Sequence, residues 1–405
     1  MAINVCFLVA EHPFLDARIF KKEAKSLLKR GYQVTMIVPR INGCLFDVDG
    51  TLFRDSYREA SFIFEGIRIL TYEQSRSERN HKKLLHNLRS DSHTRFDNPL
   101  TQLGIQQKAD IYHAHEFDSL YSGIGIKRAL AAAGKQSKLI YDSHELEADP
   151  LEKASVRTKK VKQQMLEAML HETDYIITVS ESIKEWLHAI DSQTPIQIIC
   201  NSPPLAREYR SGQGNNQELV IAFEGVMNHK RGSFRKLLEV LELCNQEFEL
   251  KLKIIGGSKK SEIALSIPDH LKDKVIHTGW VDYGSISEAM KDADIGWIDL
   301  DAEHSLNNRF AMPNKFFSYL NNAVPVLTNQ CKDMDDFIRT YQCGYVVRKL
   351  QATAEDYVKA IRFLHSNRGE IRKMSRHARQ VMESKYCWEH METRLFAIYQ
   401  YLLNA

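Results

Sequence analysis

The chain alternates between short apolar runs and longer segments whose apolar positions recur at helical spacing. The runs at residues 3–10 and 33–38 flank a helical segment at 16–30 that Gly31 ends. This order predicts two parallel strands joined by a helix, and hence the α/β fold class. Strands are also expected at residues 66–72, 109–114, 138–141, 174–179, 196–200, 219–223, 250–255, 275–278, 293–298, 324–327 and 344–347.

A polar stretch divides this succession into two halves. Residues 211–217 contain only Ser, Gly, Gln and Asn, a composition typical of a linker. The 405 residues of the chain are also enough for two or three domains. We expect a first domain at residues 1–210, a second at 218–385 and a C-terminal helical segment at 386–405.

Composition narrows the class of protein. The apolar share of 43% is enough for proper cores, and a net charge of +3 is too small to favour a nucleic-acid partner. The seven cysteines are scattered without a C-x-x-C pair, so neither a disulfide framework nor a zinc site is expected, and the reduced cytoplasm is the expected location. The apolar run at 3–10 lacks a basic leader and reads as a strand, not as a signal peptide.

Histidine–glutamate pairs end two consecutive predicted strands of the first half. One pair is His115 with Glu116, and the other is His144 with Glu145. Parallel strands present their carboxyl ends at one edge of a sheet, so we expect the two pairs to lie close together. The repetition favours a functional site over two isolated structural pairs.

Asp16 and Arg18 lie in the first strand-to-helix connection, at the same edge of the predicted sheet. They either contribute to the site or only cap and solvate the start of the helix, and the residues alone favour neither interpretation.

Positive charge gathers at two predicted helix starts of the second half. Lys230 and Arg231 precede one helix, and Lys315 opens another. Free N–H groups, the helix dipole and the cationic side chains all attract an anion at such a place. Gly225 would let the backbone approach a ligand. We therefore predict a phosphate site, the alternative being basic helix starts that only face water.

A motif at residues 44–52 points to a different chemistry. Asp47 and Asp49 stand in a D-x-D-G-T sequence that resembles the signature of haloacid dehalogenase-type phosphatases. A turn at Asn42-Gly43 precedes it where that family has a core strand, and the chain has no Gly-Asp dipeptide for the later metal site. This family is therefore only a remote alternative.

Taken in order, the motifs resemble glycosyltransferase family 4, whose members are retaining enzymes of the GT-B fold. The first such motif is D-x-R-x-x-K-E-A, which residues 16–24 match with one additional lysine. The others are the H-x-H-E and Y-D-x-H-E-L segments, D-x-x-I-T-V-S-E at 174–181, the glycine–cation loop at 225–232, and P-x-K at 313–315. The resemblance implies two Rossmann-like domains facing a cleft, with the last helix crossing back to the first domain. It also implies a nucleotide-diphosphate sugar as substrate, with UDP or GDP as the nucleotide, and no cofactor or metal.

The resemblance also assigns roles to residues of this chain. His115 would contact the donor sugar at the catalytic centre; Gly225, Lys230, Arg231 and Lys315 would hold the diphosphate; Gly256, Gly279, Asn314 and Ser318 would bind the nucleotide; and Asp16, Arg18, Glu116, His144 and Glu145 would line the acceptor side. No general base is implied, because the leaving phosphate would help to deprotonate the acceptor.

The chain departs from the family at two glutamates. Ser318 stands where the family has the glutamate that grips the ribose hydroxyls, and Phe310 stands where the family has the partner of that glutamate. The loss of a bidentate carboxylate costs about 1–3 kcal/mol of ribose binding if no other group substitutes. Two alternatives follow: a catalytically silent subunit that activates a partner enzyme, and a sugar-nucleotide epimerase on the same fold. The retained cations argue against a decayed site.

Family members of this kind often build surface polysaccharides, which implies a lipid-linked or polysaccharide acceptor. Residues 75–97 are basic, and Leu84, Leu85 and Leu88 form one apolar stripe among them. Such a helix either rests on anionic lipid at the inner face of the membrane or is an ordinary solvated helix.

Overall fold

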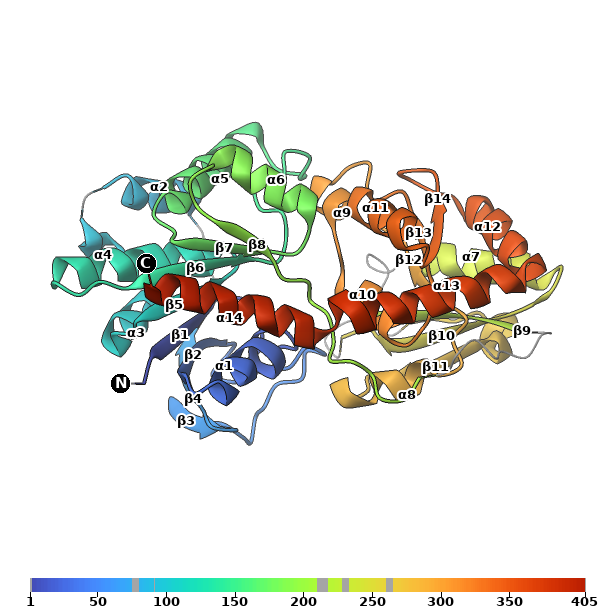
Figure 1. Ribbon diagram of the computed structural model, residues 1–405, viewed down its shortest axis with the longest axis horizontal. Coiled ribbons are helices and arrows are strands. Elements are labelled where there is room, and N and C mark those ends of the chain that lie inside the picture. Colours follow the sequence, from blue (N-terminus) through green and yellow to red (C-terminus); the bar gives the residue numbers. More distant parts are fainter. Residues whose placement is uncertain are drawn as a thin grey trace. The chain divides into compact units, whose positions relative to one another are not determined.

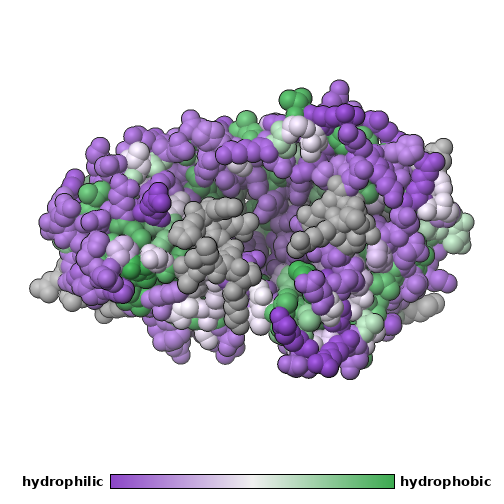
Figure 2. Space-filling model, turned by 180° about the vertical axis from the view of Figure 1, so that it is seen from behind, coloured by the Kyte–Doolittle hydropathy of each residue, from purple (hydrophilic) through white to green (hydrophobic). Residues whose placement is uncertain are grey.

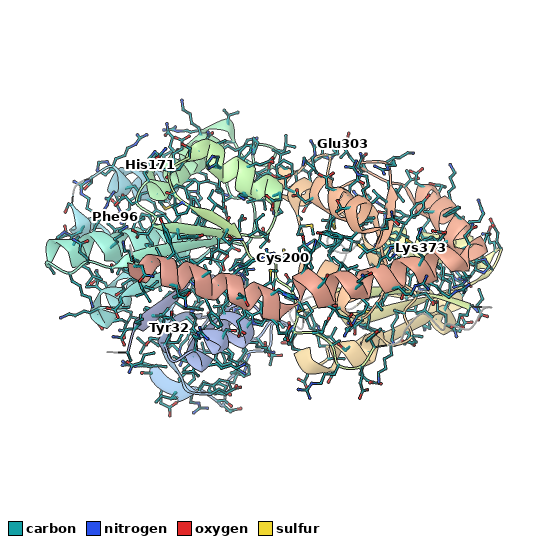
Figure 3. All side chains as sticks on the ribbon, viewed as in Figure 1. Tyr32, Phe96, His171, Cys200, Glu303 and Lys373 are labelled. Carbon is teal, nitrogen blue, oxygen red and sulfur yellow. The ribbon has the colours of Figure 1, made fainter. Side chains whose placement is uncertain are left out.

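The computed structural model describes residues 2–74, 80–90, 92–209, 218–227, 233–259 and 265–404. The chain forms two compact units. Unit 1 comprises residues 1–199 with 392–405, and unit 2 comprises residues 200–391. Figure 1 shows the elements of both units, and Figure 3 labels Cys200, with which unit 2 begins.

Unit 1 is built on a sheet with the strand order β3-β4-β2-β1-β5-β6-β7-β8. β3 pairs antiparallel with β4, and the other neighbours pair in parallel. The strands are β1 (Asn4–Val9), β2 (Gln33–Arg40), β3 (Ser61–Phe64), β4 (Ile67–Glu73), β5 (Ile111–His115), β6 (Lys138–Ser143), β7 (Tyr175–Thr178) and β8 (Ile196–Ile198). β5 is buried along its whole length, as expected of a parallel strand covered on both faces.

Helices connect the strands of unit 1 except β2, β3 and β4, which follow one another directly. The helices are a π-helical segment (Ile19–Ala24) continued by α1 (Lys25–Lys29), then α2 (His81–Leu88), α3 (Pro99–Gln107), α4 (Phe117–Ala132), α5 (Val156–Leu170) and α6 (Glu181–Ile190). The long helix α14 (Trp388–Asn404) joins this unit from residue 392 onward. Its residues Leu395, Ile398, Tyr399 and Leu402 are buried, and Arg394 donates a hydrogen bond to the carbonyl oxygen of Ile198 at 3.1 Å. The expected fold class and its returning C-terminal helix are confirmed.

Unit 2 contains a parallel sheet with the order β11-β10-β9-β12-β13-β14. Its strands are β9 (Glu218–Val226), β10 (Glu249–Gly257), β11 (Val275–Gly279), β12 (Ile295–Ile298), β13 (Val326–Asn329) and β14 (Gly344–Val347). Its helices include α7 (Phe234–Asn245), α8 (Ile286–Met290), α9 (Leu306–Phe310), α10 (Asn314–Asn321), α11 (Lys332–Tyr341), α12 (Ala354–Ser366) and α13 (Arg368–Val381). The strand order reverses between β9 and β12, and α/β sheets bind ligands at the carboxyl ends of such strands.

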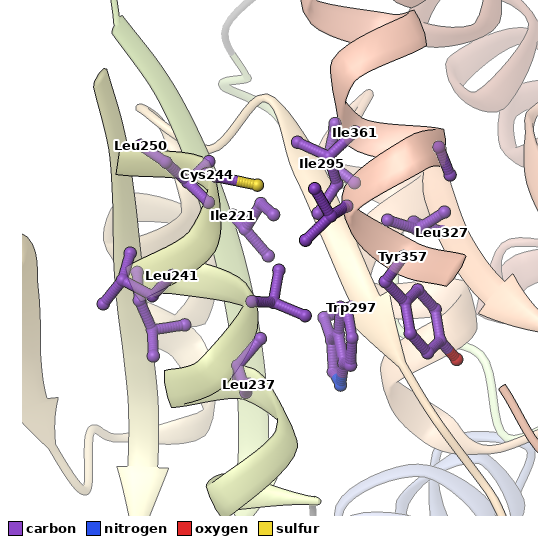
Figure 4. Close-up of a cluster of buried hydrophobic side chains, with 14 of the residues drawn as sticks. Ile221, Leu237, Leu241, Cys244, Leu250, Ile295, Trp297, Leu327, Tyr357 and Ile361 are labelled. Carbon is purple, nitrogen blue, oxygen red and sulfur yellow. The ribbon is translucent and has the colours of Figure 1, made fainter. Parts of the chain in front are cut away.

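The core of unit 2 forms around an aromatic contact between the sheet and α12 (Figure 4). The rings of Trp297 on β12 and Tyr357 on α12 have centroids 4.1 Å apart, and both side chains are buried. Ile221 of β9 and Leu241 of α7 belong to the same cluster. This packing fixes β9 and β12 side by side, which holds the edge of the sheet where the chemistry is expected.

The phosphatase-like motif lies in the connection between β2 and β3. Isolated bridges join Ile41 to Cys44 and Phe46 to Leu52, and the N–H of Gly50 donates to the carbonyl oxygen of Asp47 at 3.0 Å. Asp47 therefore belongs to a turn, not to the end of a core strand, so the context that this phosphatase family requires is missing around the motif.

The hydropathy of the surface and of the helices is relevant to what a membrane-spanning segment requires. Figure 2 shows hydrophilic residues over most of the visible face, with apolar residues scattered between them. Across the described ranges, the helices are too short or too polar to cross a bilayer. Leu85 and Leu88 of α2 are buried, so most of the apolar stripe predicted within residues 75–97 packs inside unit 1.

Candidate active site

A buried ion pair lies at the carboxyl ends of β5 and β6 in unit 1. Arg18 is only 1% exposed, and its Nε and Nη2 donate to the two carboxylate oxygens of Asp142 at 2.9 and 2.8 Å. Its Nη1 donates to the carbonyl oxygen of Ile199 at 2.8 Å, and its Nε lies 2.9 Å from Oε1 of Glu23. The guanidinium is thus fully engaged within the unit, as a buried charge must be.

The two carboxyl groups beside Arg18 differ in protonation. Burial raises the pKa of Asp142, but the charges of Arg18 and His144 outweigh it, so this pKa lies well below its ordinary value. Burial and the charge of Asp142 raise the pKa of Glu23 well above its ordinary value. Asp142 is therefore the ionised partner of Arg18, and Glu23 stays protonated.

Two stacked histidines extend this network into the core. The rings of His113 and His115 lie 4.4 Å apart, and both side chains are fully buried. Nδ1 of His113 lies 2.9 Å from the hydroxyl of Tyr399, and Nδ1 of His115 lies 3.4 Å from Nε2 of His144. Burial lowers the pKa of each buried ring, so both are neutral at physiological pH.

The outer part of the network alternates in charge. Nε2 of His144 lies 3.1 Å from Asp142, and its Nδ1 lies 3.3 Å from Oε1 of Glu116. His12 lies between Glu116 and Asp16, with separations of 3.7 and 3.5 Å. Burial lowers the pKa of His12, but its hydrogen bonds to Asp16 and Glu116 outweigh this and raise the pKa to about 10. His12 is therefore a cation held between two carboxylates.

Glu116 combines a strained backbone with an unsatisfied oxygen. Its φ of 72° and ψ of 172° place it in a region that residues other than glycine rarely adopt. Its Oε2 is buried and has no hydrogen-bond partner. Strain of this kind is often stored at functional sites, and the free oxygen can accept a hydroxyl hydrogen from a ligand.

Two groups of donor atoms in unit 1 are close enough to surround a metal ion. One is Glu23, His113, His115 and Asp142, and the other is His12, Glu116 and His144. Arg18 already supplies positive charge to the first group, and the protonated His12 supplies it to the second. We therefore assign no metal to either group.

In unit 2, Lys315 places an ammonium group at the carboxyl end of β9. Its Nζ lies 3.7 Å from the centroid of the Phe223 ring, and it would lie 3.8 Å from a Cβ atom at Gly225. Burial lowers the pKa of Lys315 to about 8, although the charge of Glu224 opposes the shift. Throughout the described residues, no carboxylate oxygen lies within ion-pair distance of this ammonium group.

The start of α10 adds hydrogen-bond donors beside this cation. The helix begins at Asn314, and its N-cap residue, Pro313, provides no side-chain cap. The first N–H groups of a helix have no partner within it, and together with the dipole they attract an anion. Lys315 and the start of α10 can therefore receive an anion, and no carboxylate of the described residues lies within ion-pair distance of the ammonium group.

The glycines at the carboxyl ends of β9, β10 and β11 differ in why glycine is needed at each position. Gly225 and Gly256 pair in register between β9 and β10, with φ of 107° and 112°. A Cβ at Gly256 would lie 2.5 Å from the carbonyl oxygen of Gly225, so strand packing alone requires glycine there. Gly279 ends β11, two strands from β9, and has open space around it.

Asp299, which follows β12, serves the fold. Its two oxygens accept from the hydroxyl of Tyr357 at 2.8 Å and from Nζ of Lys236 at 2.7 Å, and the hydroxyl of Ser233 also donates to it. Both oxygens of this carboxylate are therefore occupied by partners within unit 2.

Comparisons with known proteins agree with this geometry. Residues 17–207 match the family model described as Glycosyltransferase Family 4, and residues 218–367 match the model described as Glycosyl transferases group 1. The chain belongs to the GT-B glycosyltransferases. The resemblance of its motifs to family 4 is thereby confirmed. A search of the curated proteins finds no match to this glycosyltransferase.

Solved structures share the fold of the glycosyltransferase at low sequence identity. The sucrose-phosphate synthase of Thermosynechococcus elongatus is 13% identical over 100% of both chains, with a TM-score of 0.73. Anabaena Alr3699/HepE, solved with UDP-glucose, is 12% identical over 98% of this chain and 99% of its own, with a TM-score of 0.64. The lipopolysaccharide outer core galactosyltransferase WaaB is 13% identical over 98% of this chain and 99% of its own, with a TM-score of 0.60.

The structure brings together most of the site residues that the sequence of the glycosyltransferase suggests. In unit 1 the network joins Asp16, Arg18, Glu116, His115 and His144, whereas Glu145 is exposed. In unit 2 Gly225, Lys315 and Ser318 lie together, and Asn314 is exposed at the start of α10. Lys230 and Arg231 lie outside the described residues, so their assigned role stays a prediction.

Sequence reasoning did not single out His12, Glu23, Asp142 or Glu224 as site residues. A signal existed for two of them: Asp142 ends a predicted strand, and Glu23 interrupts the apolar face of a helix. His12 and Glu224 can be recognised as site residues only from their contacts with residues that are distant in the chain.

Replacement of Arg18 by alanine should destabilise unit 1 strongly. It would leave the ionised Asp142 buried without its partner, which costs about 3–5 kcal/mol. Hydrogen exchange of the β5 amides in the full-length chain measures this loss. Arg58→Ala is the matched control, because the side chains of Arg58 and Asp55 are 73% and 93% exposed and such pairs contribute about 0–1 kcal/mol. Equal exchange in the two variants would contradict the structural role of Arg18.

Proposed function

We propose that this glycosyltransferase is a retaining hexosyltransferase that uses a nucleotide-diphosphate sugar. The observation that carries the proposal is the anion site of unit 2, where no carboxylate among the described residues pairs with Lys315 at ion-pair distance beside the start of α10. A sugar diphosphate supplies that charge, and UDP and GDP are the favoured nucleotides. The structure of HepE with UDP-glucose supports the choice of a nucleotide sugar.

The anion site suits the departure of a diphosphate. Negative charge builds on this leaving group as the glycosidic bond breaks, and fixed donors lower the barrier by stabilising that charge. Lys315 and the N–H groups of α10 provide such donors without rearrangement. Lys230 and Arg231 remain predicted to add two cations. No metal or cofactor takes part in this proposal, since the cations of the protein neutralise the diphosphate.

The acceptor is proposed to reach the network of unit 1. His144 and Glu116 lie at its outer side, and Oε2 of Glu116 is free to receive a hydroxyl hydrogen. His115, predicted to touch the donor sugar, is fully buried behind His144. We infer that His115 acts by holding His144 in place, and that the leaving phosphate takes the proton of the acceptor.

A lipid-linked or polysaccharide acceptor in surface polysaccharide biosynthesis fits this family best, as the name of the neighbour WaaB illustrates. We place the enzyme in the cytoplasm, where nucleotide sugars are available, and at the inner face of the membrane. Contact with anionic lipid would use basic side chains of residues 75–97, because Leu85 and Leu88 are buried.

Removal of the Lys315 ammonium group should weaken nucleotide binding. We expect Lys315→Ala to bind UDP or GDP about 10- to 100-fold less tightly, since a charge-assisted contact contributes about 1.5–3 kcal/mol. Isothermal titration with UDP, GDP, ADP, CDP and dTDP would identify the nucleotide and measure the loss. Lys332→Ala is the control, because Lys332 forms an exposed pair with Asp336 on α11. Absence of binding by the unmodified protein would overturn the proposed function.

Nucleotide binding should also weaken as the pH rises from 7 to 9.5. Lys315, whose pKa is lowered to about 8, loses its positive charge over this range, whereas the diphosphate keeps its negative charge. Lys315→Arg keeps a cation at every pH of the series and should bind with little pH dependence. Titration of both proteins at several pH values tests this expectation, and parallel pH curves would show that Lys315 does not meet the diphosphate.

A further inference from the structure

One carboxyl group near the carboxyl end of β9 in unit 2 has a buried oxygen without a hydrogen-bond partner. Glu224 lies near the end of β9, directly before Gly225, and its Oε2 is buried without a hydrogen bond. Asp299, the carboxylate after the neighbouring strand β12, is occupied by Lys236 and Tyr357. Since buried carboxylate oxygens are rarely left unpaired, the free oxygen of Glu224 points to a donor supplied by a ligand.

The position of Glu224 is fixed from the sheet and from α10. Its backbone N–H donates to the hydroxyl oxygen of Tyr319 at 2.9 Å, and that hydroxyl donates to the carbonyl oxygen of Trp297 at 3.2 Å. Its carboxyl group is hydrogen-bonded with the hydroxyl of Ser318, and the charge of Lys315 acts on it. The side chain is thus placed between the anion site and the buried face of α10.

The position of Glu224 is relevant to the glutamate that the family has and that Ser318 replaces in this chain. Ser318 of α10 stands where the resemblance to family 4 implies a carboxylate, and the carboxyl group of Glu224 on β9 is hydrogen-bonded with its hydroxyl. A carboxyl group from β9 therefore lies beside the position on α10 where the resemblance implies one. A nucleotide whose diphosphate meets Lys315 carries its ribose directly beside that diphosphate, within reach of the same neighbourhood.

We propose that Glu224 accepts hydrogen bonds from the vicinal hydroxyls of the donor ribose and so replaces a carboxylate at position 318. The proposal rests on the proposed function, because it needs a nucleotide sugar at Lys315. A ribose offers two adjacent O–H donors, and carboxylates at the edge of Rossmann-like sheets receive such hydroxyls. Glu224 would thereby select a ribonucleotide over its 2′-deoxy analogue.

The test compares ribose and deoxyribose in four full-length proteins. UDP, GDP and their 2′-deoxy forms are titrated into the unmodified chain, Glu224→Gln, the double variant Glu224→Gln with Ser318→Glu, and Glu242→Gln. Glu242 is the control, since its side chain is 56% exposed on α7. We expect the unmodified chain to prefer the ribonucleotide by about tenfold. Glu224→Gln should lose that preference, and the double variant should regain it.

The outcomes separate this inference from the proposed function. If the unmodified chain binds UDP or GDP but Glu224→Gln keeps the full preference for ribose, Glu224 does not hold the ribose and only this inference fails. If the unmodified chain binds neither nucleotide, the donor site itself is absent. Recovery of the preference in the double variant also excludes misfolding as the cause of the loss, because that variant carries the same change at Glu224.

Discussion

The ammonium group of Lys315 carries a charge that no described carboxylate neutralises at ion-pair distance, and the site of unit 2 is arranged around it. Desolvation makes such a charge costly, as the lowered pKa of about 8 shows. The Phe223 ring and the start of α10 hold the cation in place but supply no anion. A site of this kind is best explained by a ligand that brings the missing charge.

In unit 1, by contrast, the cations of the site are paired with carboxylates of the same unit. Arg18 is matched by Asp142, and His12 is matched by Asp16 and Glu116, so this network is neutralised by its own residues. Its geometry therefore does not depend on a ligand. The groups that remain are polar and local: the buried, unpaired Oε2 of Glu116 and the partly exposed ring of His144. Such groups suit hydroxyls, whereas unit 2 suits a phosphate.

Much of this could be predicted from the sequence because it depends on local patterns. Apolar runs located the parallel strands, and the histidine–glutamate pairs did fall at the carboxyl ends of the neighbouring strands β5 and β6. The four-residue edge strand β3 was missed, because its apolar run is too short to stand out before the two-residue turn at Glu65-Gly66. The first helix begins at Ile19 and not at Asp16, since Asp16 caps it by accepting from the N–H groups of Arg18 and Ile19.

Contacts between distant residues were beyond such patterns. The sequence near Arg18 does not predict its buried ion pair with Asp142, and the sequence near Ser318 does not predict the contact with a carboxyl group from β9. A crystal structure with UDP or GDP bound would test the central claim most directly. The account predicts diphosphate oxygens within hydrogen-bond distance of Nζ of Lys315 and of the first N–H groups of α10. Density for the nucleotide elsewhere, with Lys315 still lacking an anion, would contradict it.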